Sequence, residues 1–240
     1  MIQFRKLLAG RRNVASYSKM QTRFYKSGTS DHLEHNENKD YWGVLLEGID
    51  DGQFKGARAL DFACGKGRNV KNLLSLAQWE HVDGCDLSEA NINYCRANFN
   101  SPSHFYVANG QDTGVPNSNY YDFVMTTISL QHIPVYDIRR SILQDILRVL
   151  KPGGRFSFQM GFGPDLVDSM GRPRSGYFEN AVTANSTNGD HDVRVTSISE
   201  LETDLRDIGF SEIQSEVRDS FSDMGHPNWI YVHCLKPKQI

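Results

Sequence analysis

Apolar residues in the middle of the chain follow two alternating patterns. Short runs rich in branched and aromatic residues predict strands, and they occupy residues 59–62, 81–88, 104–108, 121–127 and 155–160. Between them, apolar residues recur every three or four positions, which predicts helices over 69–76, from 88 onward and over 135–150. Strands that alternate with helices call for an α/β fold built on a parallel, doubly wound sheet.

The pattern continues after a less regular stretch. Ser199 is a candidate N-cap, and Gly209 stands where a helix commonly ends. The elements expected there are a helix over 200–208 and strands over 213–217 and 229–235.

Glycines and an acidic residue follow the first strand. Gly65 and Gly67 allow the backbone to approach a ligand where a side chain would block it. Asp61 lies where the strand ends, and ligands of open α/β sheets bind outside the carboxyl ends of the strands. Asp86 ends the second strand about 20 residues after this loop, a spacing suited to hydrogen-bonding ribose hydroxyls. Together these residues predict a bound nucleoside.

The glycine spacing distinguishes two kinds of nucleoside ligand. A dinucleotide site prefers Gly-x-Gly-x-x-Gly, but Val70 stands where the third glycine belongs. The segment from Asp61 to Gly67 instead resembles motif I of the class I S-adenosylmethionine (SAM) methyltransferases, Asp-x-Gly-x-Gly-x-Gly, with Ala63 at the first glycine. Because alanine is small, we expect Ala63 to narrow the turn slightly and to leave binding intact.

Three later segments strengthen this resemblance. They are a Phe-Asp-like strand at 121–127, the segment 129–133 that resembles the lining of the methyl-transfer site, and the Leu-Lys-Pro-Gly-Gly turn at 150–154. The resemblance implies a Rossmann-like, three-layer α/β fold. Its seven-stranded sheet would be mostly parallel, with the last strand antiparallel and inserted beside the fifth.

The resemblance also implies a cofactor and its site. The cofactor would be SAM, with S-adenosylhomocysteine (SAH) as its product. The residues carried over as cofactor-binding are Asp61, Ala63, Gly65, Gly67, Asp86, Leu87, Gln111, Asp112 and Thr127. Gln111 and Asp112 would bind the adenine amine, although the ordinary polarity of a loop explains them equally well.

A catalytic group is harder to identify. His132 follows the fourth strand and is the first candidate for a base or a substrate-orienting group, against the alternative of a core histidine that caps the next helix. His191 and His226 are weaker candidates in loops. Orientation alone supplies about 7–11 kcal/mol in favourable cases, so methyl transfer does not require a base.

Composition narrows the class of protein. The 240 residues carry a net charge of −3, which disfavours a nucleic-acid partner held by a basic surface. No apolar run approaches the roughly 20 residues that span a bilayer. The four cysteines lack metal or disulfide spacing, so we expect buried thiols, no metal site and a cytoplasmic location.

Two segments are predicted to surround the cofactor domain, which we place at residues 51–240. Residues 1–50 would form a helical cap, in which Trp42 either fills the core or roofs the pocket on a helix over 39–47. The first 30 residues carry no acidic residue, which also fits a transit peptide or a basic contact surface. Residues 161–196 contain many glycines and are expected to form a substrate lid, or else a disordered spacer.

The predicted function is methyl transfer from SAM to a small molecule, such as a sugar or a natural-product intermediate. The sequence lacks the Pro-Pro-Tyr motif of amino-methylating DNA enzymes and the paired-Glu loop of protein arginine methyltransferases. The alternatives are a SAM-fold binding protein without catalysis and a nicotinamide-dependent oxidoreductase. The acceptor, the atom methylated and the oligomeric state do not follow from the sequence.

Overall fold

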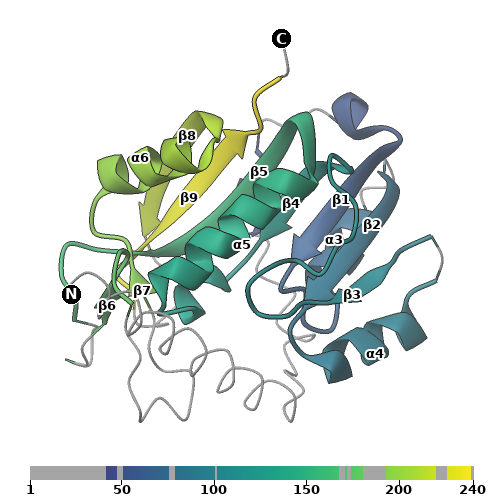
Figure 1. Ribbon diagram of the computed structural model, residues 1–240, viewed down its shortest axis with the longest axis horizontal. Coiled ribbons are helices and arrows are strands. Elements are labelled where there is room, and N and C mark those ends of the chain that lie inside the picture. The colour runs from purple at the N-terminus through teal and green to yellow at the C-terminus, as the bar shows by residue number, and fades with distance from the viewer. Residues whose placement is uncertain are drawn as a thin grey trace, which may run out of the picture.

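The computed structural model describes residues 42–47, 51–75, 79–100, 102–167, 171, 174–180, 193–219 and 226–238. Within these ranges the chain forms a seven-stranded sheet in the order β3-β2-β1-β4-β5-β9-β8 (Figure 1). Its strands are β1 (Ala57–Phe62), β2 (Trp79–Asp86), β3 (Phe105–Val107), β4 (Tyr121–Thr126), β5 (Leu150–Phe162), β8 (Ser211–Asp219) and β9 (Asn228–Leu235).

Strand direction confirms the fold predicted from the sequence. Strands β1 to β5 pair in parallel, whereas β9 lies antiparallel between β5 and β8. The chain leaves β1 toward β2 and β3, and it returns to the other side of β1 with β4. This reversal places a crevice at the carboxyl ends of β1 and β4, where open α/β sheets bind ligands.

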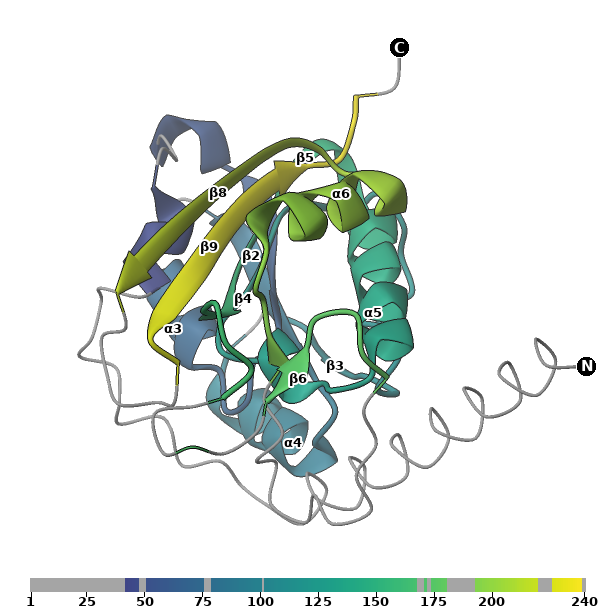
Figure 2. The same ribbon diagram turned by 90° about the vertical axis from the view of Figure 1, so that its left-hand side faces the viewer.

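Helices cover both faces of the sheet (Figure 2). The helical elements are η1 (Gly43–Leu46), η2 (Asp51–Phe54), α3 (Arg68–Leu74), α4 (Glu89–Asn98), η3 (Leu130–His132), α5 (Tyr136–Val149) and α6 (Ile198–Ile208). Helices α5 and α6 bury their apolar stripes against one face, and α3, α4 and η1 pack on the other. A short two-stranded sheet, β6 (Ser175–Gly176) with β7 (Val193–Arg194), lies beyond the end of β5.

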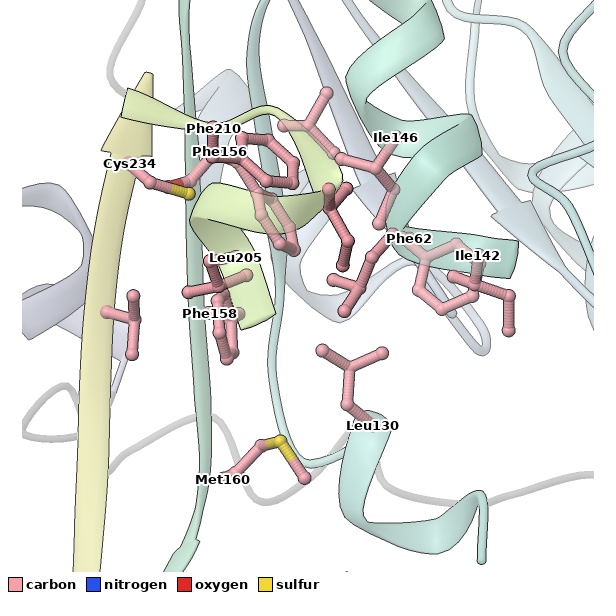
Figure 3. Close-up of a cluster of buried hydrophobic side chains, with 14 of the residues drawn as sticks. Phe62, Leu130, Ile142, Ile146, Phe156, Phe158, Met160, Leu205, Phe210 and Cys234 are labelled. Atoms are coloured by element: carbon pink, nitrogen blue, oxygen red, sulfur yellow. The ribbon is translucent and has the colours of Figure 1, made fainter. Parts of the chain in front are cut away.

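The larger core lies between the sheet and helices α5 and α6. Figure 3 shows Phe156 and Phe158 of β5 facing Ile142 and Ile146 of α5, with Leu205 of α6 beside them. The rings of Phe156 and Phe158 stack at 5.0 Å between centroids. Burial of these residues follows from the helical spacing of α5 and the period-two alternation of β5.

Several local predictions were wrong. The described part of the helix expected over 39–47 is mainly the short 3₁₀ element η1; its Leu45 is buried, as is Trp42, which directly precedes it. The helix expected over 69–76 spans Arg68–Leu74, and Leu74 at its end is 37% exposed. The cap of α6 is Ser197, whose hydroxyl accepts a hydrogen bond from the backbone N–H of Glu200, and not Ser199.

The turn at 150–154 also differs from its prediction. It lies within β5, which pairs with β4 first at Leu150 and again from Arg155, so the segment between forms a bulge. Gly153 takes a φ of +80° there, which glycine adopts without strain. The Lys-Pro-Gly-Gly segment therefore ends α5 and starts the strand at once.

The predicted cap over residues 1–50 lies largely outside the described residues, as does most of the segment 161–196. Among the described residues, no helix combines the length and the apolar character needed to span a membrane. The four cysteines are buried and free, as predicted.

Candidate functional site

The loop after β1 is tied directly to the end of β2. The Asp86 carboxylate accepts hydrogen bonds from the backbone N–H of Gly65 at 2.9 Å and of Ser88 at 2.7 Å. The N–H of Cys64 donates to the carbonyl of Cys85 at 2.9 Å. A carboxylate offers about four lone pairs, so Asp86 keeps acceptor capacity for the ribose hydroxyls predicted from the sequence.

The same loop is built from left-handed backbone conformations. Ala63, Gly65 and Gly67 have φ values of +59°, +54° and +85°. A Cβ on Gly67 would lie 2.5 Å from the ring of Phe99, so a side chain here would have to displace that ring as well as adopt a left-handed conformation. Ala63 adopts the same left-handed conformation as the glycines, which costs an L-residue about 1–2 kcal/mol.

Asp61 is a buried carboxyl group at the end of β1. Its side chain is 1% exposed, and neither carboxylate oxygen has a hydrogen-bond partner. Burial raises the pKa of Asp61 to about 7, and the Asp86 charge adds to this rise, whereas the nearby Arg68 charge and the adjoining Asn69 amide oppose it. A buried carboxylate without a partner is costly, and a cation placed beside it would stabilise the charged form.

The end of β4 meets the start of α3. The hydroxyl of Thr127 accepts hydrogen bonds from the Asn69 amide at 2.8 Å and from Arg68 at 3.4 Å. The next residue, Ile128, has a φ of +51°, which is rare for a β-branched residue. Such strain persists where the surrounding structure fixes it, and it concentrates at ligand sites.

The loop after β3 lies one strand further along the same edge. Asp112 accepts hydrogen bonds from the Asn109 amide at 2.5 Å and from the backbone N–H of Gly114 at 2.9 Å. Gln111 is exposed, and its backbone N–H donates to the Asn109 side chain. These contacts give Asp112 a structural role within the loop. Its predicted contact with adenine, like that of Gln111, stays a prediction.

The three histidine candidates occupy different surroundings. His132 lies in η3, directly after β4, and is half-buried. His226 is buried, with its ring 5.3 Å from that of Trp229. His191 lies outside the described residues. The catalytic role of His132 stays a prediction.

Two buried glutamines lie near this edge: Gln131 falls in the segment 129–133 noted in the sequence, whereas Gln159 was missed by sequence reasoning. Gln159 on β5 is 0% exposed, and neither end of its amide has a hydrogen-bond partner. The register Thr126↔Phe158 places Gln159 beside Thr127. Gln131, in η3, is also buried and has an unpartnered amide oxygen. Polar groups buried without partners are uncommon, so these two indicate polar ligand atoms between β4 and β5.

The residues present fit SAM by two criteria. SAM carries a sulfonium and an ammonium group, and Asp61 is a buried carboxyl that lacks a positive partner in hydrogen-bond contact. It also carries two ribose hydroxyls, for which Asp86 retains acceptor positions beside the glycine loop. Leu87 follows Asp86 at the same strand end and is partly buried.

Comparisons with known proteins agree with this fit. Residues 60–158 match the model of a methyltransferase domain family. The O-methyltransferase rstn1 of Aspergillus nomiae is 30% identical over 108 residues, which cover 43% of this chain and 46% of that protein. The chain thus matches less than half the length of this curated relative.

Solved structures resemble the fold as a whole. A chain from the complex between the Haloferax volcanii Trm112 methyltransferase activator and a methyltransferase superposes with a TM-score of 0.63 at 15% identity, over 90% of this chain and 99% of that one. Phosphoethanolamine N-methyltransferase 2 of Haemonchus contortus, bound to phosphomonomethylethanolamine and SAH, gives 0.61 at 16% identity, over 83% of this chain and 53% of that one. Residues 60–158 therefore resemble a methyltransferase domain in sequence, and the described part of the chain has the fold of solved methyltransferases.

Proposed function

We propose that this protein moves a methyl group from SAM to a nucleophile on a small polar molecule by in-line displacement. The observation that carries the proposal is Asp61, a fully buried carboxyl without a hydrogen-bond partner at the carboxyl end of β1. The nearby Arg68 charge compensates the Asp61 carboxylate only in part, since burial still raises its pKa to about 7, and a cofactor with two cationic groups would add positive charge there.

Each part of the site has a role in binding or orientation. SAM, when bound, supplies the reactive methyl on its sulfonium. Asp61 holds positive charge, Asp86 accepts from the ribose, and the loop at 63–67 leaves room for the cofactor beside its backbone. Thr127 joins the β4 end to α3 through Asn69, which fixes the distance between the cofactor side and the acceptor side.

The acceptor would lie against Gln159 and Gln131. An amide that is buried without partners gains most from a ligand that brings both a donor and an acceptor, such as a hydroxyl next to a carbonyl. His132, in the same 3₁₀ turn as Gln131, is proposed as the group that accepts a proton or orients the nucleophile. A base adds roughly 10²–10⁴-fold where the nucleophile needs deprotonation.

The insert at 161–196 is proposed to cover the acceptor as part of one domain over residues 51–240. Its described part is firmly attached to the helices beside η3. Tyr177 donates a hydrogen bond to buried Asp204 of α6 at 2.9 Å, and its carbonyl accepts from Arg139 of α5. Four free, buried thiols support the proposed cytoplasmic location.

Two measurements test this function. The first is calorimetric binding of SAM, SAH and NAD to the wild-type chain and to Asp61→Asn. We expect SAM and SAH to bind and NAD not to bind, with weaker SAM binding in the variant. The second is transfer of labelled methyl from SAM to panels of phenols, sugars, small amines, protein and RNA.

The outcomes separate the parts of the proposal. Absence of SAM and SAH binding would refute methyl transfer itself. Turnover confined to protein or RNA would refute the small acceptor while leaving the cofactor site intact. Binding of SAH without transfer to any acceptor would favour a binding protein of the same fold.

A further inference from the structure

A second cluster of chemically active side chains lies away from the cofactor edge. It comprises His81 and Asp83 of β2 and His104, which directly precedes β3 (Figure 1). One ligand atom from each lies within 4.8 Å of the others, and no other such trio occurs among the described residues. Asp83 is three residues before Asp86 on β2, so about 10 Å separates the cluster from the ribose-binding position.

The two imidazoles lie on either side of the Asp83 carboxylate, at ion-pair distance. The nearest nitrogen of His81 is 3.7 Å from one Asp83 oxygen, and Nδ1 of His104 is 3.4 Å from the other. Neither imidazole makes a hydrogen bond to the carboxylate, although the backbone N–H of His104 donates to it at 2.8 Å. Ligand atoms around a tetrahedral zinc ion lie about 3.4 Å apart, given metal–ligand bonds of about 2.0–2.2 Å.

The Asp83 carboxylate is held in one orientation by a buried phenol. Tyr121 donates a hydrogen bond to Asp83 at 2.6 Å, and both residues are completely buried. Such a second partner fixes the orientation of a carboxylate ligand. The two imidazole rings are nearly perpendicular, at 82° with 5.8 Å between centroids.

One ligand gives the cluster access to solvent. The side chain of His104 is 60% exposed, whereas His81 is 5% exposed. An exposed imidazole can rotate to bring its nitrogen onto an ion that His81 and Asp83 hold in place. The fourth position would be filled by water, or by the phenol of Tyr120, whose oxygen is 3.4 Å from Nε2 of His81.

We propose that His81, Asp83 and His104 bind a divalent transition-metal ion of the zinc type. Two imidazoles and one carboxylate are donors that suit zinc, cobalt or nickel and do not suit magnesium or calcium, which take oxygen ligands. The ion would link the end of the loop before β3 to the middle of β2. The sequence predicted no metal site because Asp83 and His104 are 21 residues apart, outside any metal-binding motif.

The test uses the full chain, stripped of metals with a chelator and titrated with Zn²⁺ by calorimetry. Cobalt is followed in parallel by its visible absorption, and Mg²⁺ is the control ion. We expect one Zn²⁺ site, no comparable Mg²⁺ site and loss of zinc binding on acidification, since imidazole must be neutral to bind.

Three variants assign the ion to this cluster. His104→Ala removes an exposed side chain, so it should fold normally and weaken zinc binding by at least about tenfold, the smallest loss typical even of outer-shell changes. Tyr121→Phe keeps all three ligands and should weaken binding by about 10–100-fold. His132→Ala is the matched control and should bind as the wild type does.

Two results would overturn the proposal. One is a wild-type chain that binds no zinc at concentrations that occupy ordinary two-histidine sites. The other is equal zinc affinity in the wild type and in His104→Ala, which would assign the ion to other residues. Neither result bears on SAM binding, which is measured separately with SAH in the metal-free chain.

Discussion

Ligand binding at the cofactor edge should be coupled to the ionisation of Asp61. Burial raises the pKa of this carboxyl to about 7 in the free protein, so it is largely protonated at pH 6. A cation brought beside it by SAM or SAH favours the carboxylate and lowers the pKa. Binding should therefore release a proton below pH 7.

The magnitude follows from the pKa alone. If SAH binds only the ionised form, its dissociation constant rises by about tenfold from pH 8 to pH 6, which corresponds to about 1.4 kcal/mol. At pH 6, about 0.9 proton should be released for each SAH bound. In Asp61→Asn the affinity should be weaker at pH 8 and nearly independent of pH.

The assay is calorimetric titration with SAH at pH 6, 7 and 8 in two buffers of different ionisation enthalpy. Binding is preferable to melting temperature, because His233 also links folding to pH. Burial and the Arg155 charge lower the pKa of His233 to about 4, so stability present above about pH 6.5 is lost as the pH falls toward 4. Asp61 acts oppositely: its raised pKa stabilises the free fold below about pH 4, and this stability is lost as the pH rises through 7.

Two results would refute this reasoning. Equal SAH affinity at pH 6 and pH 8 would mean that Asp61 does not change its protonation on binding. The same pH dependence in Asp61→Asn would assign the proton to another group, including the amino group of the ligand itself.

Further predictions concern stability and acceptor binding. Ala63→Gly relieves the strain of a φ of +59°, and after the greater conformational entropy of glycine in the unfolded chain is subtracted it should raise the free energy of unfolding by about 0.5–1 kcal/mol. Ala59→Gly within β1 relieves no such strain and should lower the free energy of unfolding. Unfolding in urea measures both variants. Gln159→Leu removes two unpartnered polar atoms and should therefore stabilise the free protein by about 1–2 kcal/mol. It should keep the affinity for SAH and lower kcat/KM for the acceptor by at least tenfold. An unchanged kcat/KM would exclude Gln159 from the acceptor site. Asp204 is the buried acceptor of hydrogen bonds from Tyr177 and Arg140, so Asp204→Asn should lower the free energy of unfolding by about 2–3 kcal/mol, measured in urea. Asp207→Asn, at an exposed position on the same helix, should lower it by less than about 0.5 kcal/mol. Equal losses would contradict the structural role of Asp204.

The order of elements was predictable because their signals are local. Helix α5 shows a regular apolar stripe, and its Ile138, Ile142 and Ile146 are buried as predicted. The position of β9 beside β5 came from the resemblance to a family and not from the strand's own residues. Helix boundaries were less certain where two residues could act as the N-cap, as with Ser197 and Ser199. The path of the backbone before α6 decides which hydroxyl reaches the N–H of Glu200.

The candidate site was predictable only where its residues lie in one motif. Asp61 and Asp86 follow from glycine spacing, and their loops meet in the structure through Gly65. Gln159 was missed because a polar residue in an alternating strand usually faces solvent. Gln159 is buried because β4 and β9 flank its strand and η1 packs against β5. These contacts join segments far apart in the sequence, so the local pattern of residues does not reveal them.

Several departures from ordinary folding rules lie close together at the carboxyl ends of β1, β4 and β5. Asp61 and Gln159 are buried polar groups without partners, and Ala63 and Ile128 hold left-handed conformations beside them. Each such feature costs about 1–3 kcal/mol, and a whole domain is stable by only about 5–15 kcal/mol. Single departures also occur elsewhere among the described residues, such as the buried indole N–H of Trp79 and the positive φ of Asn119 and Glu212. A carboxyl and an amide left unpaired next to a strained loop are explained together if a polar, positively charged ligand completes them.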